Sequence, residues 1–230
     1  MIFNQKLVFP SFIVMGIVLL CLHAARIHAQ TVGSFVPRHI DGEAKYIFYL
    51  HGGVVTNKGD GAINESAPEW GPYEYTYILD SLKKRGFHII SERRMPEVDD
   101  SVYVRKIIAQ IDTLKAAGAR TPNILVVGAS AGGHIALYVA SRSGDDNLKF
   151  VILGACRPST YMDYETLDLQ GNFLSVIERS DPHGTCSALF QNRKHIRFKE
   201  VVLNTNLSHG FIYKGYNEWI DPIITWANAK

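Results

Sequence analysis

Several features that would point to particular classes of protein are missing from this sequence. No Lys/Arg-rich tract stands out among its 230 residues, and the formal net charge is only +2. Nucleic-acid binding therefore has no electrostatic support, because contacts to phosphates need clustered basic side chains. No CxxC pair or Cys/His cluster is present, so neither a metal nor another cofactor is expected. Internal repeats and low-complexity tracts are also missing.

One long apolar run stands apart from the rest of the chain, at the N-terminus. Residues 7–22 carry no charge, follow Lys6 and are followed by the small residue Ala29. This order is typical of a secretory signal peptide, so we predict cleavage after residue 29. Sixteen residues including Pro10 are short for a membrane span of about 20 residues. The mature protein is expected to be periplasmic or secreted without stable membrane insertion; an uncleaved N-terminal anchor is the alternative.

Cysteine is scarce, with three residues in the whole chain. Cys21 falls within the predicted signal peptide, which leaves Cys156 and Cys186 in the mature protein. An even pair in an exported protein is compatible with a disulfide. Free cysteines are also common in protein cores, so the sequence leaves a bonded pair and two free thiols as alternatives.

Residues 30–230 have the length and composition of one globular domain. Apolar runs bounded by turn residues predict strands, and apolar residues at helical spacing predict helices. The predicted strands are 46–50, 87–91, 123–127, 150–153, 172–177 and 198–204, and the predicted helices are 73–85, 100–118, 131–142 and 216–229; residues 54–71 are predicted to be a long loop. Strands apolar on both faces that alternate with helices predict a three-layer α/β architecture around a mostly parallel sheet.

The stretch Gly-Ala-Ser-Ala-Gly at residues 128–132 lies where the third strand becomes a helix. A tight strand-to-helix turn brings two backbones together, so Gly128 and Gly132 are needed on either side. Such a turn pushes the hydroxyl of Ser130 out of the backbone, at the edge of the sheet where ligands bind. Ser130 is therefore the candidate nucleophile.

A serine hydroxyl needs a base to remove its proton. His209 follows the last strand and precedes the last helix, so its loop opens on the same edge as Ser130. His183 is a competitor in a loop at that edge, with an ordinary surface position as the alternative. The remaining histidines of residues 30–230 are expected to be structural or solvated: His39, His51, His88, His134 and His195.

The imidazole needs an acid that fixes its tautomer and stabilises its positive charge. Asp181 follows the strand 172–177 and opens at the same edge; Glu178 is the alternative acid, and a turn in Ser-Asp-Pro is the alternative role of Asp181. Oxyanion donors are expected from the main-chain N–H groups of Gly53, with Val54 next in line, and of Ala131.

These motifs together resemble the α/β-hydrolase superfamily, from about residue 45 to residue 228. They are the order Ser130, Asp181, His209, His-Gly-Gly at 51–53 and the glycine-flanked serine. The resemblance implies the three-layer α/β-hydrolase fold and a Ser-His-Asp hydrolase that works through an acyl-enzyme. Residues 155–171 are too short for the folded cap domain of many relatives. A small, cap-less carboxylesterase- or lysophospholipase-type enzyme is expected.

Four residues are candidates for substrate binding. Trp70 and Tyr73 follow Gly53 and would make apolar walls, with ordinary packing as the alternative. Arg94 and Arg157 follow strands at the active edge and would hold an anionic group, with solvated or salt-bridged arginines as the alternative.

The predicted function is cleavage of small-molecule carboxylic esters. A thioesterase, amidase or peptidase with the same triad is the alternative, followed by a non-catalytic binding protein on the same scaffold. The sequence does not specify the acyl group, the alcohol or the oligomeric state.

Overall fold

The computed structural model describes residues 30–157 and 164–229. The predicted signal peptide, residues 1–29, lies outside this part of the chain and stays a prediction. Among the described residues, no helix has the length and apolar character needed to cross a membrane.

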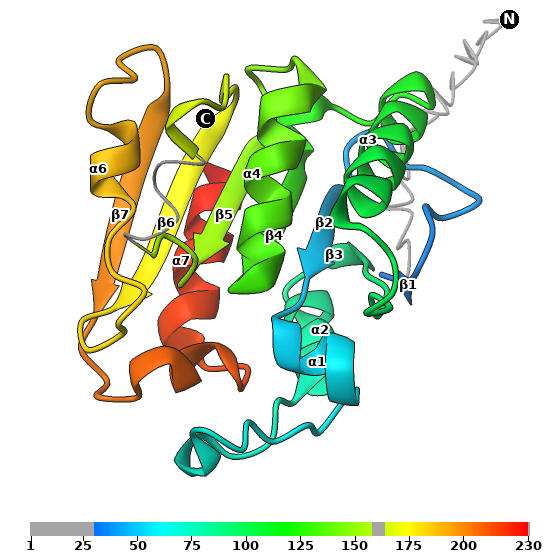
Figure 1. The fold of residues 1–230 in the computed structure, drawn as a ribbon. Helices are drawn as coiled ribbons and strands as arrows, with labels where there is room; N and C mark the ends of the chain where they lie inside the picture. The colour runs from blue at the N-terminus through cyan, green and yellow to red at the C-terminus, as the bar shows by residue number, and fades with distance from the viewer. Residues whose placement is uncertain (1–29, 158–163, 230) are drawn as a thin grey trace, which may run out of the picture.

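The core of the molecule is one seven-stranded sheet in which every neighbouring pair of strands is parallel. Its strands are β1 (Val32–Gly33), β2 (Lys45–Leu50), β3 (Phe87–Ile90), β4 (Ile124–Ala129), β5 (Lys149–Leu153), β6 (Asn172–Glu178) and β7 (Arg197–Leu203). They lie in the order β1-β3-β2-β4-β5-β6-β7 (Figure 1). The predicted parallel sheet is confirmed; the short edge strand β1 was not predicted.

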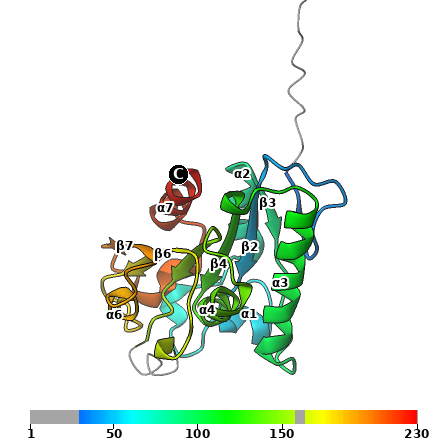
Figure 2. The same cartoon turned by 90° about the horizontal axis from the view of Figure 1, so that it is seen from above.

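Helices cover both faces of the sheet, which makes the three layers visible from above in Figure 2. The longer ones are α2 (Tyr75–Lys84), α3 (Asp100–Ala116), α4 (Ala131–Ser143) and α7 (Asn217–Asn228); the short ones are α1 (Gly53–Lys58), α6 (Ser187–Phe190), η1 (Pro68–Trp70), η2 (Thr121–Asn123) and η4 (Ser208–Ile212). Helices α3 and α4 pack on one face, and α2 and α7 pack on the other.

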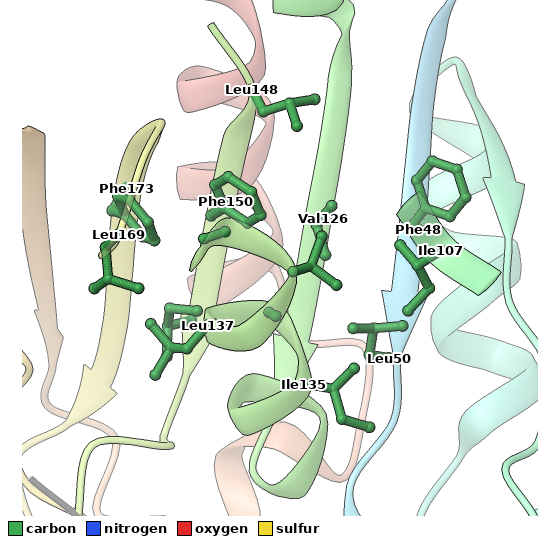
Figure 3. Packing of buried hydrophobic residues seen from close by; sticks show 14 of the residues in the cluster. Phe48, Leu50, Ile107, Val126, Ile135, Leu137, Leu148, Phe150, Leu169 and Phe173 are labelled. Carbon is green, nitrogen blue, oxygen red and sulfur yellow. The ribbon is translucent and has the colours of Figure 1, made fainter. Parts of the chain in front are cut away.

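Alternation along each strand divides the core between the two faces. On β2, Phe48 and Leu50 join the cluster under α3 and α4, whereas Ile47 and Tyr49 join the cluster under α2 and α7. Figure 3 shows the first cluster, with Ile135 of α4 pointing toward the strands. Because neither face is polar, the strands appear in the sequence as continuous apolar runs.

The order of the strands places a crevice between β2 and β4. The chain leaves β2 for its neighbour β3, then returns to the other side of β2 to make β4. The connections after β2 and β4 therefore leave in opposite directions, which opens a ligand-binding crevice at the carboxyl ends of these strands. The segments that follow them hold Gly52, Gly53 and Ser130.

The prediction that residues 54–71 form one long loop is wrong in part. Helix α1 occupies Gly53–Lys58 and η1 occupies Pro68–Trp70. Three consecutive β-branched residues, Val54, Val55 and Thr56, have low helix propensity and conceal α1 in the sequence. Burial of Val55 in the core outweighs this preference in the folded protein.

A disulfide joins Cys156, after β5, to Cys186, at the start of α6. Both cysteines are fully buried. Of the two alternatives left by the sequence, the structure contains the bonded pair. The bond connects two loops at the carboxyl edge of the sheet.

Loss of this bond is expected to destabilise the protein. The bridged residues are 30 positions apart, and closing a loop of that size in the unfolded chain corresponds to about 3–4 kcal/mol. We expect the Cys156→Ala/Cys186→Ala variant to unfold at a lower urea concentration than wild type. Its free energy of unfolding should be smaller by about 3–4 kcal/mol. As a control, reductant should shift the wild-type curve and leave the variant's curve in place. A wild-type curve insensitive to reductant would contradict the prediction.

Candidate active site

Ser130 is the single residue between β4 and α4. Its backbone has φ +50° and ψ −117°, a conformation that non-glycine residues rarely adopt. A Cβ atom at Gly132 would lie 2.0 Å from the carbonyl oxygen of Leu50, and one at Gly128 would lie 2.4 Å from that of Gly132. Both positions therefore require glycine, as predicted. This close packing of strand against helix holds the serine outside the backbone.

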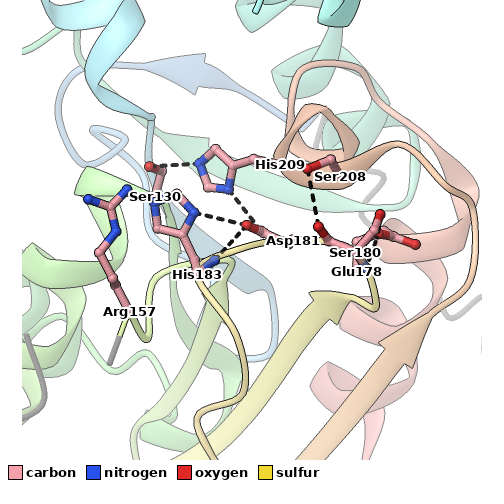
Figure 4. Close-up of polar contacts among 8 residues, drawn as sticks. All are labelled: Ser130, Arg157, Glu178, Ser180, Asp181, His183, Ser208 and His209. Carbon is pink, nitrogen blue, oxygen red and sulfur yellow. Dashed lines mark hydrogen bonds and ion pairs between the residues drawn. The ribbon is translucent and has the colours of Figure 1, made fainter. Parts of the chain in front are cut away.

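Three side chains from separate loops meet at this turn (Figure 4). The hydroxyl oxygen of Ser130 lies 3.0 Å from Nε2 of His209, and Nδ1 of His209 lies 2.8 Å from Oδ2 of Asp181. Because the carboxylate accepts from Nδ1–H, Nε2 is left to accept the proton of the serine hydroxyl. The three residues singled out from the sequence are thus brought together in a hydrogen-bonded chain.

Burial and hydrogen bonds set the charges of this chain. Burial lowers the pKa of His209 below its ordinary value of 6.5, although the carboxylate of Asp181 opposes this shift. Burial alone would raise the pKa of Asp181, but hydrogen bonds from His183 and His209 more than offset it and hold that pKa below its ordinary value. At neutral pH the chain therefore consists of a neutral imidazole and an ionised carboxylate.

The positions of the Asp181 and His209 side chains depend on a glycine that the sequence reasoning missed. Gly154 follows β5 with φ +53°, and a Cβ atom there would lie 2.8 Å from Oδ2 of Asp181 and 3.2 Å from the ring of His209. A larger residue would push the acid and the imidazole away from Ser130. The signal was available, because Gly154 directly follows a predicted strand at the active edge.

Glu178, the alternative acid, has a different task. One of its carboxylate oxygens accepts from the main-chain N–H groups of Thr205 and Asn206, and the other accepts from that of Ser180. Glu178 thereby holds together the loop after β6 and the loop that leads to His209. These hydrogen bonds, together with one from the hydroxyl of Ser180, are made within the two loops and not to the imidazole.

His183 is the residue that the sequence reasoning underrated. Its ring stacks on that of His209, with centroids 3.9 Å apart and planes inclined by 23°. Its Nδ1 lies 2.9 Å from Oδ1 of Asp181, and its Nε2 lies 2.9 Å from a guanidinium nitrogen of Arg157. His183 lies in a loop at the active edge, as expected, but its side chain is half-buried and lines the cavity in front of Ser130. Its place two residues after Asp181 was the available signal.

Asp181, His183 and His209 each place one potential metal-ligand atom within 4.8 Å of the other two. The arrangement of these atoms fits a metal site poorly. Each Nδ1 atom faces a different oxygen of the carboxylate. The lone pairs of two nearly parallel, stacked rings run side by side and do not converge on one ion.

Main-chain donors surround the serine from two helix starts. Ala131 is the first residue of α4, and Gly53 and Val54 are the first residues of α1. N–H groups in a first helical turn have no acceptor within the helix. A Cβ atom at Gly53 would lie only 3.7 Å from the Cβ of Ala131, so the two helix starts lie side by side. This arrangement suits the oxyanion donors predicted from the sequence.

His51 and Arg94 fasten the loops behind the serine. The main-chain N–H of Arg94 donates to Nε2 of His51, whose Nδ1–H donates to the carbonyl of Gly52. A guanidinium nitrogen of Arg94 also donates to the carbonyl of His51. Burial, followed by the charge of Arg94, lowers the pKa of His51 to about 3, so its ring stays neutral. The structural role expected of His51 agrees with these contacts.

A cavity of about 480 Å³ opens in front of Ser130. Trp70, Tyr73 and Arg157 line it, as the sequence suggested. Arg94 does not line the cavity. It is buried, and its guanidinium donates to the carbonyl of His51 in the segment after β2. Polar residues form much of the remaining wall: Asn57, Lys58, Asn64, Glu65 and Ser66.

The aromatic residues of the cavity also pack against the elements around them. The ring of Trp70 lies 5.7 Å from that of His209, and the hydroxyl of Tyr73 is hydrogen-bonded to that of Tyr49. A Cβ atom at Gly210 would lie 2.7 Å from Trp70, so glycine at this position allows the indole to pack beside the imidazole. Trp70 and Tyr73 therefore combine cavity lining with ordinary packing, the two roles considered for them.

Comparisons with known proteins identify the fold. No family model matches the sequence, nor does any curated protein. Solved structures that resemble it include the Francisella virulence factor BioJ, with a TM-score of 0.60, 13% identity and coverage of 84% of this chain and 79% of that one. A structure reported with the metagenome-derived lipolytic enzymes LipS and LipT has a TM-score of 0.57, 12% identity and coverage of 86% and 99%. A hormone-sensitive lipase from a metagenome library has a TM-score of 0.55, 17% identity and coverage of 81% and 77%.

These likenesses and the parallel sheet establish the α/β-hydrolase fold for this chain. The fold expected from the motifs is thus confirmed. The likeness concerns the fold, and the chemistry of the protein depends on the side chains of its own site.

Proposed function

We propose that this protein is an exported serine hydrolase that cleaves carboxylic esters through Ser130, His209 and Asp181 and an acyl-enzyme. The observation that carries the proposal is the unbroken chain of hydrogen bonds from the serine hydroxyl to the carboxylate, 3.0 Å and then 2.8 Å long. It begins at a serine held in a strained turn at the floor of a cavity. A nucleophile, its base and an orienting acid in this order define acyl-transfer chemistry.

Each residue has a defined step in this mechanism. His209 takes the proton of Ser130 through Nε2 while the serine oxygen attacks the ester carbonyl. The N–H groups of Gly53 or Val54 and of Ala131 stabilise the negative oxygen that forms. Asp181 stabilises the imidazolium, which then protonates the departing alcohol. In the second half of the cycle His209 deprotonates water, which attacks the acyl-enzyme. The bond between the acyl carbon and the oxygen of Ser130 then breaks, the imidazolium returns the proton to that oxygen, and the acid leaves.

The test is labelling with a fluorophosphonate, which reacts with activated serines, followed by mapping of the labelled peptide. Modification of Ser130 together with turnover of p-nitrophenyl esters would support the proposal. A folded protein that never reacts at Ser130 would contradict it and favour a binding role. A panel of esters, thioesters and peptide amides separates the three acyl-transfer activities that share this triad.

The pH dependence of turnover follows from the state of the base. Protonated His209 cannot accept a proton, so kcat/KM is expected to rise through the pKa of His209 as the pH increases. Because the folded protein lowers this pKa from 6.5, the midpoint of the acid limb should lie below pH 6.5. The measurement is kcat/KM for a neutral ester between pH 4 and pH 9, with circular dichroism at each pH as the control. A midpoint well above pH 6.5 would contradict the prediction.

Export is part of the proposal and has two supports. One is the N-terminal pattern of Lys6, an uncharged run and Ala29. The other is the disulfide between Cys156 and Cys186, a bond typical of oxidising compartments. Sequencing the N-terminus of the exported protein tests this part. Gln30 should be first if cleavage follows Ala29, whereas an intact Met1 would favour the anchored alternative.

A further inference from the structure

The carboxylate of Asp181 is held by a second histidine, whose ring is stacked beside that of the catalytic histidine. Both the main-chain N–H and Nδ1–H of His183 donate to Oδ1 of Asp181, each at 2.9 Å. Oδ2 faces Nδ1 of His209 at 2.8 Å. The two oxygens thus have separate partners, and rotation of the carboxyl group would break three hydrogen bonds at once (Figure 4).

Arg157 determines which nitrogen of His183 carries the proton. A guanidinium nitrogen always donates, so Nε2 of His183, 2.9 Å away, is the acceptor. The ring proton is therefore on Nδ1, where it is needed by Asp181. In this tautomer the ring donates to Asp181 while it stacks on the ring of His209.

The disulfide links the two loops that carry this arrangement. Arg157 directly follows Cys156 after β5, and His183 precedes Cys186 by three residues in the loop after β6. The cross-link holds the β5 loop against the loop of the acid. Arg157, His183 and Asp181 are therefore joined both by side-chain hydrogen bonds and by a covalent bond between their loops.

We propose that His183 and Arg157 are positioning residues that act on the reaction through Asp181. This inference rests on the proposed function. His183 holds the carboxylate so that Oδ2 points at His209, and Arg157 keeps His183 in the tautomer that does so. The arm composed of Arg157 and His183 extends the hydrogen-bonded chain Ser130–His209–Asp181 by two members, of which His183 also stacks on His209.

This role makes a different prediction for Arg157 from the substrate-binding role considered above. An arginine that binds a substrate carboxylate should change KM for acidic esters only. A positioning residue should lower kcat for acidic and neutral esters alike, with little change in KM, because the geometry of the base is disturbed after the substrate has bound. The two roles are therefore separated by kinetics with matched acidic and neutral p-nitrophenyl esters.

The first experiment substitutes His183. His183→Ala should lower kcat about 10- to 100-fold for both esters at unchanged KM, a loss typical of a displaced catalytic group. His183→Asn should recover most of this loss, because its amide nitrogen lies where Nδ1 does and can donate to Oδ1. His195→Ala, which removes an exposed histidine elsewhere, is the matched control and should behave as wild type.

The second experiment substitutes Arg157. The charged and titratable groups that act on the pKa of His209 are Asp181, which raises it, and His183 and Arg157, which lower it. Arg157→Met should lower kcat for both esters and move the acid limb of kcat/KM to higher pH. Arg157→Lys should keep the limb near its wild-type position. Because loss of the positive charge alone moves this limb, the positioning role is measured by the equal fall of kcat for both esters at unchanged KM.

The outcomes separate the two proposals. If wild-type protein is not labelled at Ser130, the proposed function fails and this inference fails with it. If wild type is active but His183→Ala keeps its kcat, or His183→Asn loses as much as His183→Ala, the positioning role is overturned and the proposed function stands. An Arg157→Met variant altered only in KM for acidic esters would overturn the role of Arg157. Thermal unfolding of each variant shows that it is folded.

Discussion

Replacing Ser130 with alanine is expected to lower kcat for ester hydrolysis by about six orders of magnitude, as is typical when the nucleophile of a triad is removed. The reason is that, among the residues the structure describes, the hydroxyl hydrogen-bonded to Nε2 of His209 is that of Ser130. The serine oxygen lies 3.0 Å from the base at the floor of the cavity, and the turn that holds it is fixed by Gly128 and Gly132. Without this oxygen no acyl-enzyme forms, and only stabilisation of direct attack by water remains.

The fold should tolerate this change. The hydrogen bond from the backbone N–H of Ser130 to the carbonyl of Leu153 remains in the variant. The thermal midpoint should therefore stay close to that of wild type, while fluorophosphonate labelling disappears. Stopped-flow and steady-state assays with a p-nitrophenyl ester measure the loss of kcat. Activity within tenfold of wild type would show that the nucleophile lies elsewhere.

The second large effect is expected from Asp181→Asn, which should lower kcat by about four orders of magnitude. The contacts of His183 determine which way the new amide group is turned. The two N–H groups of His183 donate at the Oδ1 position, so the amide oxygen of the variant must occupy it. The amide NH₂ group then faces Nδ1 of His209, which becomes an acceptor. The proton moves to Nε2, and the imidazole can no longer accept from Ser130.

Asp168→Asn is the matched control, because Asp168 is an exposed carboxylate in the segment before β6. It should leave kcat unchanged. The measurement is kcat for a neutral ester at pH 8, with thermal unfolding to show that both variants are folded. Equal activities of the two variants would exclude Asp181 as the orienting acid and direct attention to Glu178.

Local pattern in the sequence was sufficient to predict the fold and the three candidate residues. Apolar runs predict buried strands because both faces of the sheet are covered by helices. The turn around Ser130 is predictable because the glycines on either side follow from backbone sterics alone. His209 and Asp181 were found because a parallel sheet places the ends of all its strands at one edge, so the order of elements determines which loops meet.

The errors have a common origin in side-chain packing. Arg94 follows β3 at the active edge, as a binding residue would, but its guanidinium turns back to the carbonyl of His51. Helix α1 is stabilised by the burial of Val55 and not by local propensity. Glu178 and Asp181 are equivalent by sequence position. Their roles are separated only because one carboxylate accepts from backbone N–H groups and the other from imidazoles.

The sequence by itself determined the order of the elements, the place of the nucleophilic turn and the loops that could reach it. These depend on burial and backbone sterics, which act between residues near one another in the chain. Only the tertiary structure decided that His183 contacts the acid and Arg157 contacts His183, that the two cysteines bridge their loops and that Arg94 lies away from the cavity. These depend on the direction of side chains from distant segments, and a hydrogen bond exists only where donor and acceptor are brought to within about 3 Å of each other.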